Sequence, residues 1–471
     1  HPGLVTESHR SRRADRTVTS QRWRRLEAEI EAAVDYLDSA PALTILRPTA
    51  VPLVDGDDLL SRLVNRRVAC CPAGFDPMLQ LLALGDLVTV LQEVMRRGGP
   101  AGTFHVAPPT AIPLRRMLRL AGVRRLGLPF TRLGLGARGG RDDADRLRHP
   151  STVSGERLKD ELELEITTPS ARVAERLGVE HGRRQAAEEL ADDDVHGFDP
   201  AYVRRLGKTL FRFLHDRWWR IEVRGIEHLP RDGAAVLAGV HRGHQPWDGV
   251  MTLHHLGHHL GRFPRFLIHP TLVKFPFLAP AMIRCGGVHA CRENADRLLD
   301  DGEILGIYPE GVRGAFALYR DAYRLGKFGR DEFVRFALRH GAPIVPYVIV
   351  GSAEIFPILG RIDAAWWRRW SEWPFLPITP TMSLIPLPSK WHIWFLEPIS
   401  VAEHGPSGAE DPAIVRALSD ETRRRMEAAM LALRDRRPAI FWGSVFDDPS
   451  FPASVDELLD RQPGSGAPPP Q

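Results

Sequence analysis

Short apolar segments that alternate with helical patterns are the feature that most constrains the fold of this chain. In the second half, AVLAGV (235–240) is followed at once by HRGHQPWDG, and EILGIY (303–308) by PEGVRG. PIVPYVIV (343–350) comes after a helical pattern from about Asp331 to Arg339. Apolar runs of this length between helices predict the buried strands of an α/β sheet. Polar side chains directly after such strands lie where α/β proteins usually place their chemistry.

The first half shows the same alternation. TILRPTAV (44–51) predicts a buried strand bounded by prolines, and GTFHVAP (102–108) predicts another. Helices are expected over Arg22–Leu37 and about Asp86–Arg97. Both halves are therefore expected to be α/β.

A change in composition suggests the domain organisation. With 471 residues the chain is long enough for two or three domains. From about Gly136 it becomes charged and less periodic, with RGGRDDADR and later AAEELADDD, and the junction is placed near Gln185 to Pro200. The final PGSGAPPPQ has the composition of a disordered tail. The predicted parts are an α/β region over 1–180, a charged linker over 181–200, a second α/β domain over 201–445, and a disordered tail over 446–471.

Charge, cysteine content and hydropathy exclude several classes of protein. Lys and Arg number 63 against 59 Asp and Glu, a formal charge of +4, which does not indicate a nucleic-acid-binding protein. The four cysteines lack the spacing of a zinc site and the density of a disulfide framework, so a reducing cytoplasm fits best. No apolar stretch approaches the roughly 20 residues that cross a bilayer. The N-terminus lacks the apolar core of a secretory signal. We expect a protein that is soluble or attached to a membrane surface.

Two histidines and an aspartate follow the strand at AVLAGV. An imidazole with an ordinary pKa near about 6.5 can take a proton from an alcohol, and a carboxylate at its other nitrogen stabilises the imidazolium. His241 and Asp248 can form such a pair if Gly243 and Pro246 turn the chain back between them. His244, four positions before Asp248, is a rival base. A purely structural role is also open, since an aspartate at the start of a helix is a common N-cap.

The loop after the second strand carries a carboxylate and a cation. Arg313, in a glycine-flanked loop with Gly311, has the planar fork that binds a phosphate in a bidentate way. Glu310 is interpreted as a residue that either orients a substrate hydroxyl or holds the loop.

In this order the segments resemble the glycerolipid acyltransferase superfamily, which includes the lysophosphatidate acyltransferases. Members carry a His and an Asp separated by four residues, an arginine block, a Phe-Pro-Glu-Gly-x-Arg segment and a strand with Val-Pro. The corresponding segments here are VHRGHQPWD, GGVHACREN with Arg292, YPEGVRG, and PIVPYVIV with Pro346. The resemblance covers about Ala201 to Ile440.

This chain departs from the family pattern at several positions. Six residues rather than four separate His241 from Asp248, which is similar to a bacterial subgroup with His-x-Gly and then Pro-x-Asp-Gly. Val240 occupies a position that is commonly Asn. Tyr308 replaces Phe, and Gly314 replaces Ser or Thr.

The resemblance implies direct acyl transfer in phospholipid biosynthesis. His241, paired with Asp248, would deprotonate the hydroxyl of a lysophospholipid, which attacks the thioester of acyl-CoA or acyl carrier protein. Arg313 and Arg292 would hold the acceptor's phosphate, Glu310 and Gly311 would belong to the substrate-binding loop, and Pro346 would shape the acyl-donor side. No metal or organic cofactor is implied. The expected location is cytoplasmic, peripheral on the inner face of the cell membrane.

Two alternative functions remain open from the sequence. The first is acyl transfer to a non-phosphorylated lipid alcohol, such as a diglyceride or a wax alcohol. The second is a non-catalytic lipid- or nucleotide-binding protein, which Val240 favours.

Other segments bear on membranes and metals. From Tyr202 a helical pattern places Leu206, Leu210, Phe213, Leu214 and Trp218 on one face, which fits either packing on the protein or insertion into a lipid interface. WWRRWSEWPF (366–375) fits either a membrane surface or a packed aromatic cluster. HHLGHH (254–259) has metal-ligand spacing on a helix, but a helix with partly exposed histidines is preferred.

The first half resembles the C-terminal part of an extended short-chain dehydrogenase, in the nucleotide-sugar epimerase style, up to about Gly178. The resemblance implies a partial Rossmann-like α/β region. In that family a Tyr-x-x-x-Lys pair supplies the tyrosine for proton transfer and the lysine that binds the cofactor. The corresponding positions here are Gln21 and Arg25, which cannot perform these roles, and a glycine-rich dinucleotide fingerprint is absent from the given sequence. We interpret this region as a scaffold or a ligand-binding remnant without a working NAD site.

Overall fold

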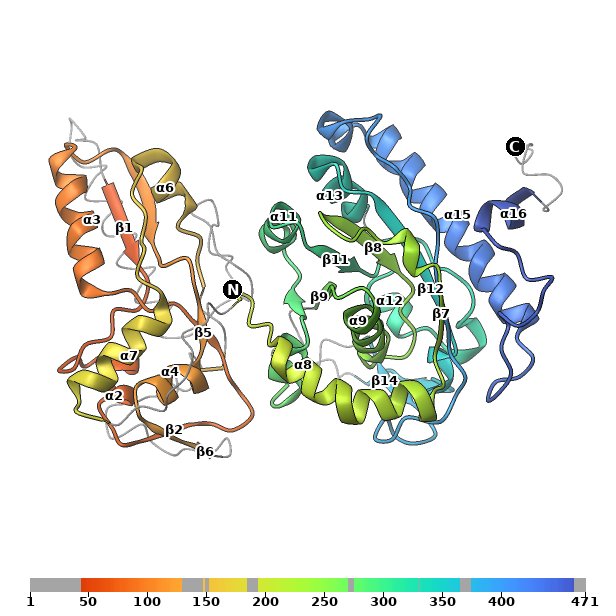
Figure 1. Cartoon of the computed structure of the whole chain (residues 1–471), viewed down its shortest axis with the longest axis horizontal. Helices are drawn as coiled ribbons and strands as arrows, with labels where there is room; N and C mark the ends of the chain where they lie inside the picture. Colours follow the sequence, from red (N-terminus) through yellow and green to blue (C-terminus); the bar gives the residue numbers. More distant parts are fainter. Residues whose placement is uncertain are drawn as a thin grey trace. The chain divides into compact units, whose positions relative to one another are not determined.

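The computed structural model describes residues 44–128, 147–148, 152–183, 194–269, 275–329, 331–364 and 374–460 (Figure 1). They divide into two compact units. The first contains the described residues up to Asp199 and those of Ile268–Glu293, and the second contains those of Pro200–Leu267 and from Asn294 onward. The predicted helix Arg22–Leu37, the positions of Gln21 and Arg25, and most of WWRRWSEWPF lie outside the described residues.

The first unit is built from short paired strands and helices. Strand β1 pairs with β4 and β2 with β6, both in parallel, whereas β3 and β5 are antiparallel. The strands predicted from TILRPTAV and GTFHVAP and the helix predicted near Asp86–Arg97 are all present. The elements are β1 (Thr44–Pro48), α2 (Leu59–Val64), β2 (Val68–Pro72), β3 (Met78–Leu79), α3 (Leu84–Arg96), β4 (Gly102–Val106), β5 (Ile112–Pro113), α4 (Leu114–Leu120), β6 (Arg124–Leu128), α6 (Glu156–Leu162), α7 (Ser170–Glu180), α10 (Leu278–Arg284) and β10 (Val288–His289).

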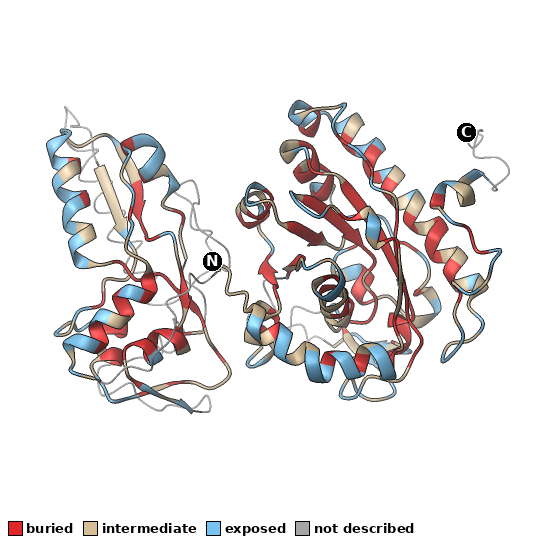
Figure 2. Cartoon of the chain, in the orientation of Figure 1, coloured by how far each residue is buried: buried red, intermediate tan, exposed pale blue. Residues whose placement is uncertain are grey.

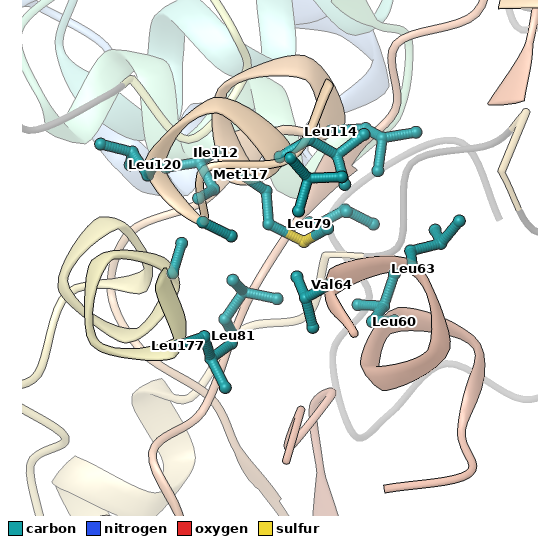
Figure 3. Packing of buried hydrophobic residues seen from close by; sticks show 14 of the residues in the cluster. Leu60, Leu63, Val64, Leu79, Leu81, Ile112, Leu114, Met117, Leu120 and Leu177 are labelled. Carbon is teal, nitrogen blue, oxygen red and sulfur yellow. The ribbon is translucent and has the colours of Figure 1, made fainter. Parts of the chain in front are cut away.

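The largest core of the first unit lies among α2, α4 and α7 (Figure 3). In α4, Leu114, Met117 and Leu118 are fully buried, and their spacing of three and four places them on one helix face. Leu63 of α2 and Leu177 of α7 pack into the same cluster. Apolar burial from three helices therefore holds the unit together.

The second unit is organised on a mixed sheet, in which its strands follow the order β9-β11-β8-β12-β15-β7. The strands β9, β11, β8 and β12 run parallel, β15 is antiparallel to β12, and β7 is parallel to β15. All residues of β8, β12 and β15 are buried. The continuous apolar sequences of β8 and β12 predict this burial, and Figure 2 shows these two strands in red. The α/β class is confirmed. The strands of this unit are β7 (Glu222–Arg224), β8 (Ala235–Gly239), β9 (Arg265–Ile268), β11 (Ile304–Ile307), β12 (Ile344–Val350), β13 (Gly360–Ile362), β14 (Leu376–Ile378) and β15 (His392–Phe395).

Helices surround this sheet, and the longest, α15, packs Met426, Met430 and Leu433 against it. The Asp411 side chain caps α15 by accepting a hydrogen bond from the Ala413 amide at 2.8 Å. The helical elements are α8 (Pro200–Leu206), η1 (Gly207–Phe211), η2 (Leu214–Trp218), η3 (Ile226–His228), α9 (Trp247–His259), α11 (Arg292–Asp300), α12 (Val312–Ala315), η5 (Tyr319–Asp321), α13 (Glu332–His340), η6 (Ser352–Glu354), η7 (Pro406–Glu410), α15 (Pro412–Arg436) and α16 (Val455–Asp460).

The predicted start of the disordered tail at 446 is wrong. Phe451 and Val455 are buried in the cluster that contains α15, and α16 follows. Their apolar contacts stabilise this segment, whereas residues 461–471 lie outside the description.

The predicted apolar stripe of the helix that begins at α8 is only partly present. Leu214 is buried, but Leu210 and Phe213 are exposed, and Phe211 is buried instead. The reason is local geometry, since η1 and η2 are π-helical turns, which shift the side-chain period away from that of an α-helix.

Candidate active site

The site begins at the carboxyl end of β8. Strand β8 lies beside β11 in parallel register, so the loops that follow both strands leave the sheet at the same edge. Gly239 ends β8 beneath the ring of Tyr347, and a Cβ at this position would lie 2.2 Å from the ring. Only glycine fits there, and two residues later the chain places His241 at the sheet edge.

His241 and Asp248 form the predicted pair. The His241 Nδ1 lies 2.8 Å from Asp248 Oδ2, and the same oxygen accepts the Arg242 amide at 2.8 Å. Asp248 is fully buried in the first turn of α9. Gly243, with φ of 73°, and Pro246 at the N-cap of α9 form the turn that brings the two residues together.

The imidazole of His241 is oriented by a second contact. Its ring stacks on that of Tyr308, with centroids 4.6 Å apart, and the side chain keeps 17% of its surface exposed. Desolvation raises the pKa of Tyr308 well above its ordinary value, so the phenol stays protonated at neutral pH. Because a carboxylate only accepts hydrogen bonds, the pairing at Nδ1 leaves the lone pair on Nε2.

His244 occupies a different environment. It is largely buried beside Phe316 and Phe356, with ring centroids 5.8 Å from each. Desolvation, together with the neighbouring His241, lowers the pKa of His244 to about 4. His244 is therefore neutral at pH 7 and resists protonation, whereas a general base must accept a proton.

Arg242 is the residue that sequence reasoning missed. Its guanidinium forms a buried bidentate ion pair with Glu310, at 2.7 and 3.2 Å. It also donates to the carbonyls of His241, Ala322 and Arg324 at 2.9, 2.6 and 3.1 Å. Arg242 thus ties the two strand-end loops to the segment around residue 323. The basic side chain directly after His241 is the only sequence signal of this role.

The Glu310 carboxylate makes its contacts inside the protein. Besides Arg242, its carboxylate accepts the Gly326 amide at 2.8 Å, and only 8% of the residue is exposed. Of the two roles expected for Glu310, this geometry favours holding the loop over orienting a substrate hydroxyl. Gly314 packs against it, since a Cβ on Gly314 would lie 2.8 Å from that of Glu310.

Arg313 stands on the outside of the same loop. Gly311, with φ of 58°, precedes α12 in a conformation that favours glycine, and both Gly311 and Arg313 are exposed. Within the described ranges no residue forms a hydrogen bond or ion pair with the Arg313 guanidinium. The Arg313 guanidinium is therefore available to bind an anion.

Two further residues were predicted for the site, Pro346 and Arg292. Pro346 is buried within β12, opposite Ala238 of β8, and its carbonyl accepts the Leu396 amide at 2.9 Å. It shapes the sheet and presents no open surface to a substrate. Arg292 is exposed at the start of α11 and belongs to the first unit, so the geometry of the second unit does not test its role.

The histidines of HHLGHH lie on α9, as predicted. His255 is 3.1 Å from His215 of η2 between ring nitrogens, and their rings stack. In the part of the chain that the structure describes, no group of three or more His, Cys, Asp or Glu side chains has the arrangement of a metal site. A search of the same residues finds no helix that is both long and apolar enough to span a bilayer.

Comparison with known proteins gives matches for both halves. An acyltransferase family model matches residues 220–350. An uncharacterized protein from Mycobacterium tuberculosis is 39% identical over 258 residues, which cover 53% of this chain and 72% of that protein. The human DGAT1/2-independent enzyme synthesizing storage lipids is 28% identical over 162 residues, covering 34% of this chain and 49% of the enzyme.

Solved structures match at low similarity. The 1-acyl-sn-glycerophosphate acyltransferase PlsC from Thermotoga maritima has a TM-score of 0.33 and 20% identity, covering 52% of this chain and 81% of that one. For the first half, the matches include UDP-N-acetylglucosamine 4-epimerase from Bacillus cereus, with a TM-score of 0.24 and 10% identity, covering 33% of this chain and 51% of the epimerase.

Proposed function

This chain belongs to the acyltransferase family, and from that premise we propose that it transfers a fatty acyl group from acyl-CoA or acyl carrier protein to the hydroxyl of a lysophosphatidate-like lysophospholipid. Acyltransferase chemistry follows from the family. The thioester donor, the lysophospholipid acceptor and the catalytic residues are the proposal.

The observation that carries the proposal is the His241–Asp248 pair at the sheet edge. With Nδ1 held by Asp248, the Nε2 lone pair of His241 accepts the proton of the acceptor hydroxyl. The buried carboxylate then stabilises the imidazolium that forms. His244 lies among aromatic rings, and its lowered pKa opposes the uptake of a proton, so we do not assign it as the base.

The bonds and protons of the reaction balance with these groups alone. As Nε2 of His241 takes the proton, the acceptor oxygen attacks the thioester carbonyl carbon and a new C–O bond forms. The C–S bond breaks, and the leaving thiolate takes the proton from the imidazolium. No covalent acyl-enzyme is formed, and no metal or organic cofactor has a step in the reaction.

The acceptor's phosphate is assigned to an exposed cation on the neighbouring strand-end loop. Arg313 is exposed on the loop that Glu310 and Arg242 hold at the same sheet edge. A guanidinium binds a phosphate in a bidentate way and can fix the acceptor relative to His241. Arg292 is retained as a second phosphate-binding residue of the proposal.

The acceptor and the long acyl chain also suggest where the protein acts. A lysophospholipid resides in a membrane, so we place the protein on the cytoplasmic face of the cell membrane, attached peripherally. A role in phospholipid biosynthesis follows from the same acceptor.

A second acceptor class has one observation in its favour. The human relative is named for the synthesis of storage lipids, which suggests an acceptor alcohol without a phosphate. Such an acceptor would make no use of the Arg313 guanidinium.

An acyl-CoA assay against a panel of lysophospholipids and diglycerides tests the proposal. We expect transfer to a lysophospholipid, with a KM for that acceptor raised at least about tenfold in Arg313→Ala, in line with the loss of a bidentate charged contact. Arg320→Ala, which changes an arginine in the following segment, is the control and should leave KM unchanged. Transfer to diglycerides alone, with no effect of Arg313→Ala, would select the second acceptor class.

A further inference from the structure

Three segments of the second unit expose large apolar side chains to solvent. Phe213 belongs to the helix that begins at α8, and the other residues belong to the loop after β14 and the loop after α15. Met382 is 78% exposed and Trp442 is 70% exposed, values that are unusual for residues of this size. We call the following set the apolar surface: Phe213, Met382, Leu384, Ile385, Phe441 and Trp442.

Hydrogen bonds join the three segments into one surface. Phe213 stacks on Trp218, with centroids 6.1 Å apart, and the Trp218 indole donates to the carbonyl of Pro386 at 3.1 Å. The Arg220 guanidinium donates to the carbonyls of Ser389 and Phe441. In Figure 1 this helix runs along the lower edge of the second unit.

The loop after β14 is built to present its apolar side chains outward. The Thr379 carbonyl accepts the Met382 amide at 3.1 Å, and the Thr379 hydroxyl accepts the Ser383 amide at 2.8 Å. Met382 and Ser383 adopt positive φ values of 49° and 62°, an unfavourable conformation for residues with a Cβ. A fixed loop that exposes consecutive apolar side chains marks an interaction surface.

The charges around the apolar surface indicate its partner. The segment 202–220, which contains this helix and Arg220 just after it, carries six basic residues and one acidic residue. The stretches 374–389 and 438–446 contain no Asp, Glu, Lys or Arg. An apolar centre with a basic flank fits a bilayer with anionic headgroups, which accepts both. A second copy of the chain would place two basic flanks against each other, which is unfavourable.

We propose that the apolar surface docks this protein on an anionic phospholipid bilayer, with Met382, Leu384, Ile385 and Trp442 entering the headgroup region. The basic residues of the flanking helix contact the lipid phosphates. The inference rests on the proposed use of a membrane lipid as acceptor, but its test measures attachment independently of catalysis.

Vesicle flotation of the full chain tests the proposal. The probes are vesicles of phosphatidylcholine with phosphatidylglycerol and vesicles of phosphatidylcholine alone. We expect the protein to bind the anionic vesicles more tightly than the vesicles of phosphatidylcholine alone. In Leu384→Ser/Ile385→Ser the affinity for the anionic vesicles should fall by about tenfold or more, because two exposed apolar side chains no longer enter the lipid. Met382→Ser should weaken binding several-fold. The matched control is Met95→Ser in α3, since Met95 is 77% exposed but lies outside the apolar surface, and it should bind as the unchanged protein does.

Equal binding by Met382→Ser and Met95→Ser would overturn the proposal. A second result would also overturn it. If the unchanged protein sediments as a dimer without vesicles, and Leu384→Ser/Ile385→Ser loses the dimer but still binds vesicles, the apolar surface is an interface between copies of the chain. Transfer to a short-chain, water-soluble lysophospholipid separates the two claims. Vesicle binding without any transfer contradicts the proposed function alone, whereas transfer without vesicle binding contradicts only the docking surface.

Discussion

At the scale of single residues, two buried carboxylates organise the site in different ways. Asp248 accepts hydrogen bonds from His241 and from the backbone of Arg242, so it fixes a ring that remains partly open to solvent. Glu310 faces the guanidinium of Arg242 and the amide of Gly326 inside the protein. The first carboxylate orients the imidazole that we propose as the base, and the second joins two loops.

The Arg242–Glu310 pair makes a first prediction. Glu310→Gln leaves the Arg242 charge buried without its counter-charge, and we expect the free energy of unfolding to fall by about 3–5 kcal/mol. Urea unfolding measures this change. Glu93→Gln removes a partly exposed carboxylate on the surface of α3 that pairs with Arg96 and Arg97, and it should leave the free energy of unfolding almost unchanged. Equal stability of the two variants would contradict the role of the buried pair.

The sequence indicated part of this residue-scale picture. His241, Asp248 and Arg313 could be named because their polar side chains follow strands directly, where α/β proteins usually place their chemistry. Their catalytic and phosphate-binding roles stay predictions. The Arg242–Glu310 pair could not, because its partners are 68 positions apart and meet only when β8 and β11 become neighbours.

At the scale of elements, the end of β8 depends on a glycine. Gly239→Ala would place a Cβ 2.2 Å from the Tyr347 ring, and the resulting shift should destabilise the protein by about 1–3 kcal/mol and disturb His241. Gly85→Ala in α3 meets no atom within 4 Å and should stabilise it slightly, because alanine favours a helix. Thermal unfolding of the two variants measures this difference. If Gly239→Ala left the unfolding temperature unchanged, this end of β8 would not be tightly packed.

The histidines between η2 and α9 predict a loss of stability in acid. Desolvation lowers the pKa of His254 to about 4 and of His255 to about 3, with smaller effects from the neighbouring His215, His258 and His259. The unfolded chain takes up these protons near pH 6.5, and the folded chain only below about 4. Stability is therefore complete above pH 7 and falls as the pH drops below 6.5, by about 1.4 kcal/mol per pH unit for each histidine.

Urea unfolding between pH 7 and pH 4.5 measures that slope. His255→Gln should reduce the slope of stability against pH by about 1.4 kcal/mol per pH unit, the contribution of one proton, because the buried imidazole is removed. His258→Gln, at an exposed position of the same helix, should leave the slope unchanged. Identical slopes for the two variants would mean that the His255 environment is not desolvated in solution.

Prediction of the elements from sequence succeeded for the strands and failed for one helix face. AVLAGV, EILGIY and PIVPYVIV are recognisable because a strand covered on both sides is apolar throughout. The apolar stripe that includes Leu210 and Phe213 was predicted from the period of a regular α-helix. The π-helical turns that expose these residues have no recognisable signal in the sequence.

At the scale of the whole molecule, the chain leaves the second unit and returns to it. The described residues of Ile268–Glu293 belong to the first unit. There the Phe277 amide donates to the Gly74 carbonyl at 2.7 Å, and Arg284 pairs with Asp199 at 2.8 Å. Sequence patterns describe neighbours along the chain, so this excursion could not be predicted. The proposed boundaries at 180 and 200 stay predictions.

A truncated chain tests this organisation. A fragment that starts at Pro200 loses Gly74 and Asp199, so the described part of Ile268–Glu293 exposes Ala279 and Met282, which are buried in the full chain. We expect the fragment to unfold at a lower temperature than the full chain does, by calorimetry. An unchanged unfolding temperature would show that this segment needs no support from the first unit.

The most direct test of the account is the rate of CoA release from acyl-CoA in the presence of a lysophospholipid, compared between His241→Ala and His244→Ala. The His241–Asp248 pair predicts a fall of about a hundred- to ten-thousand-fold in kcat for His241→Ala, the usual contribution of a general base. His244→Ala should retain activity within about tenfold, with both variants folded by circular dichroism. Full activity in His241→Ala together with an inactive His244→Ala would contradict the account.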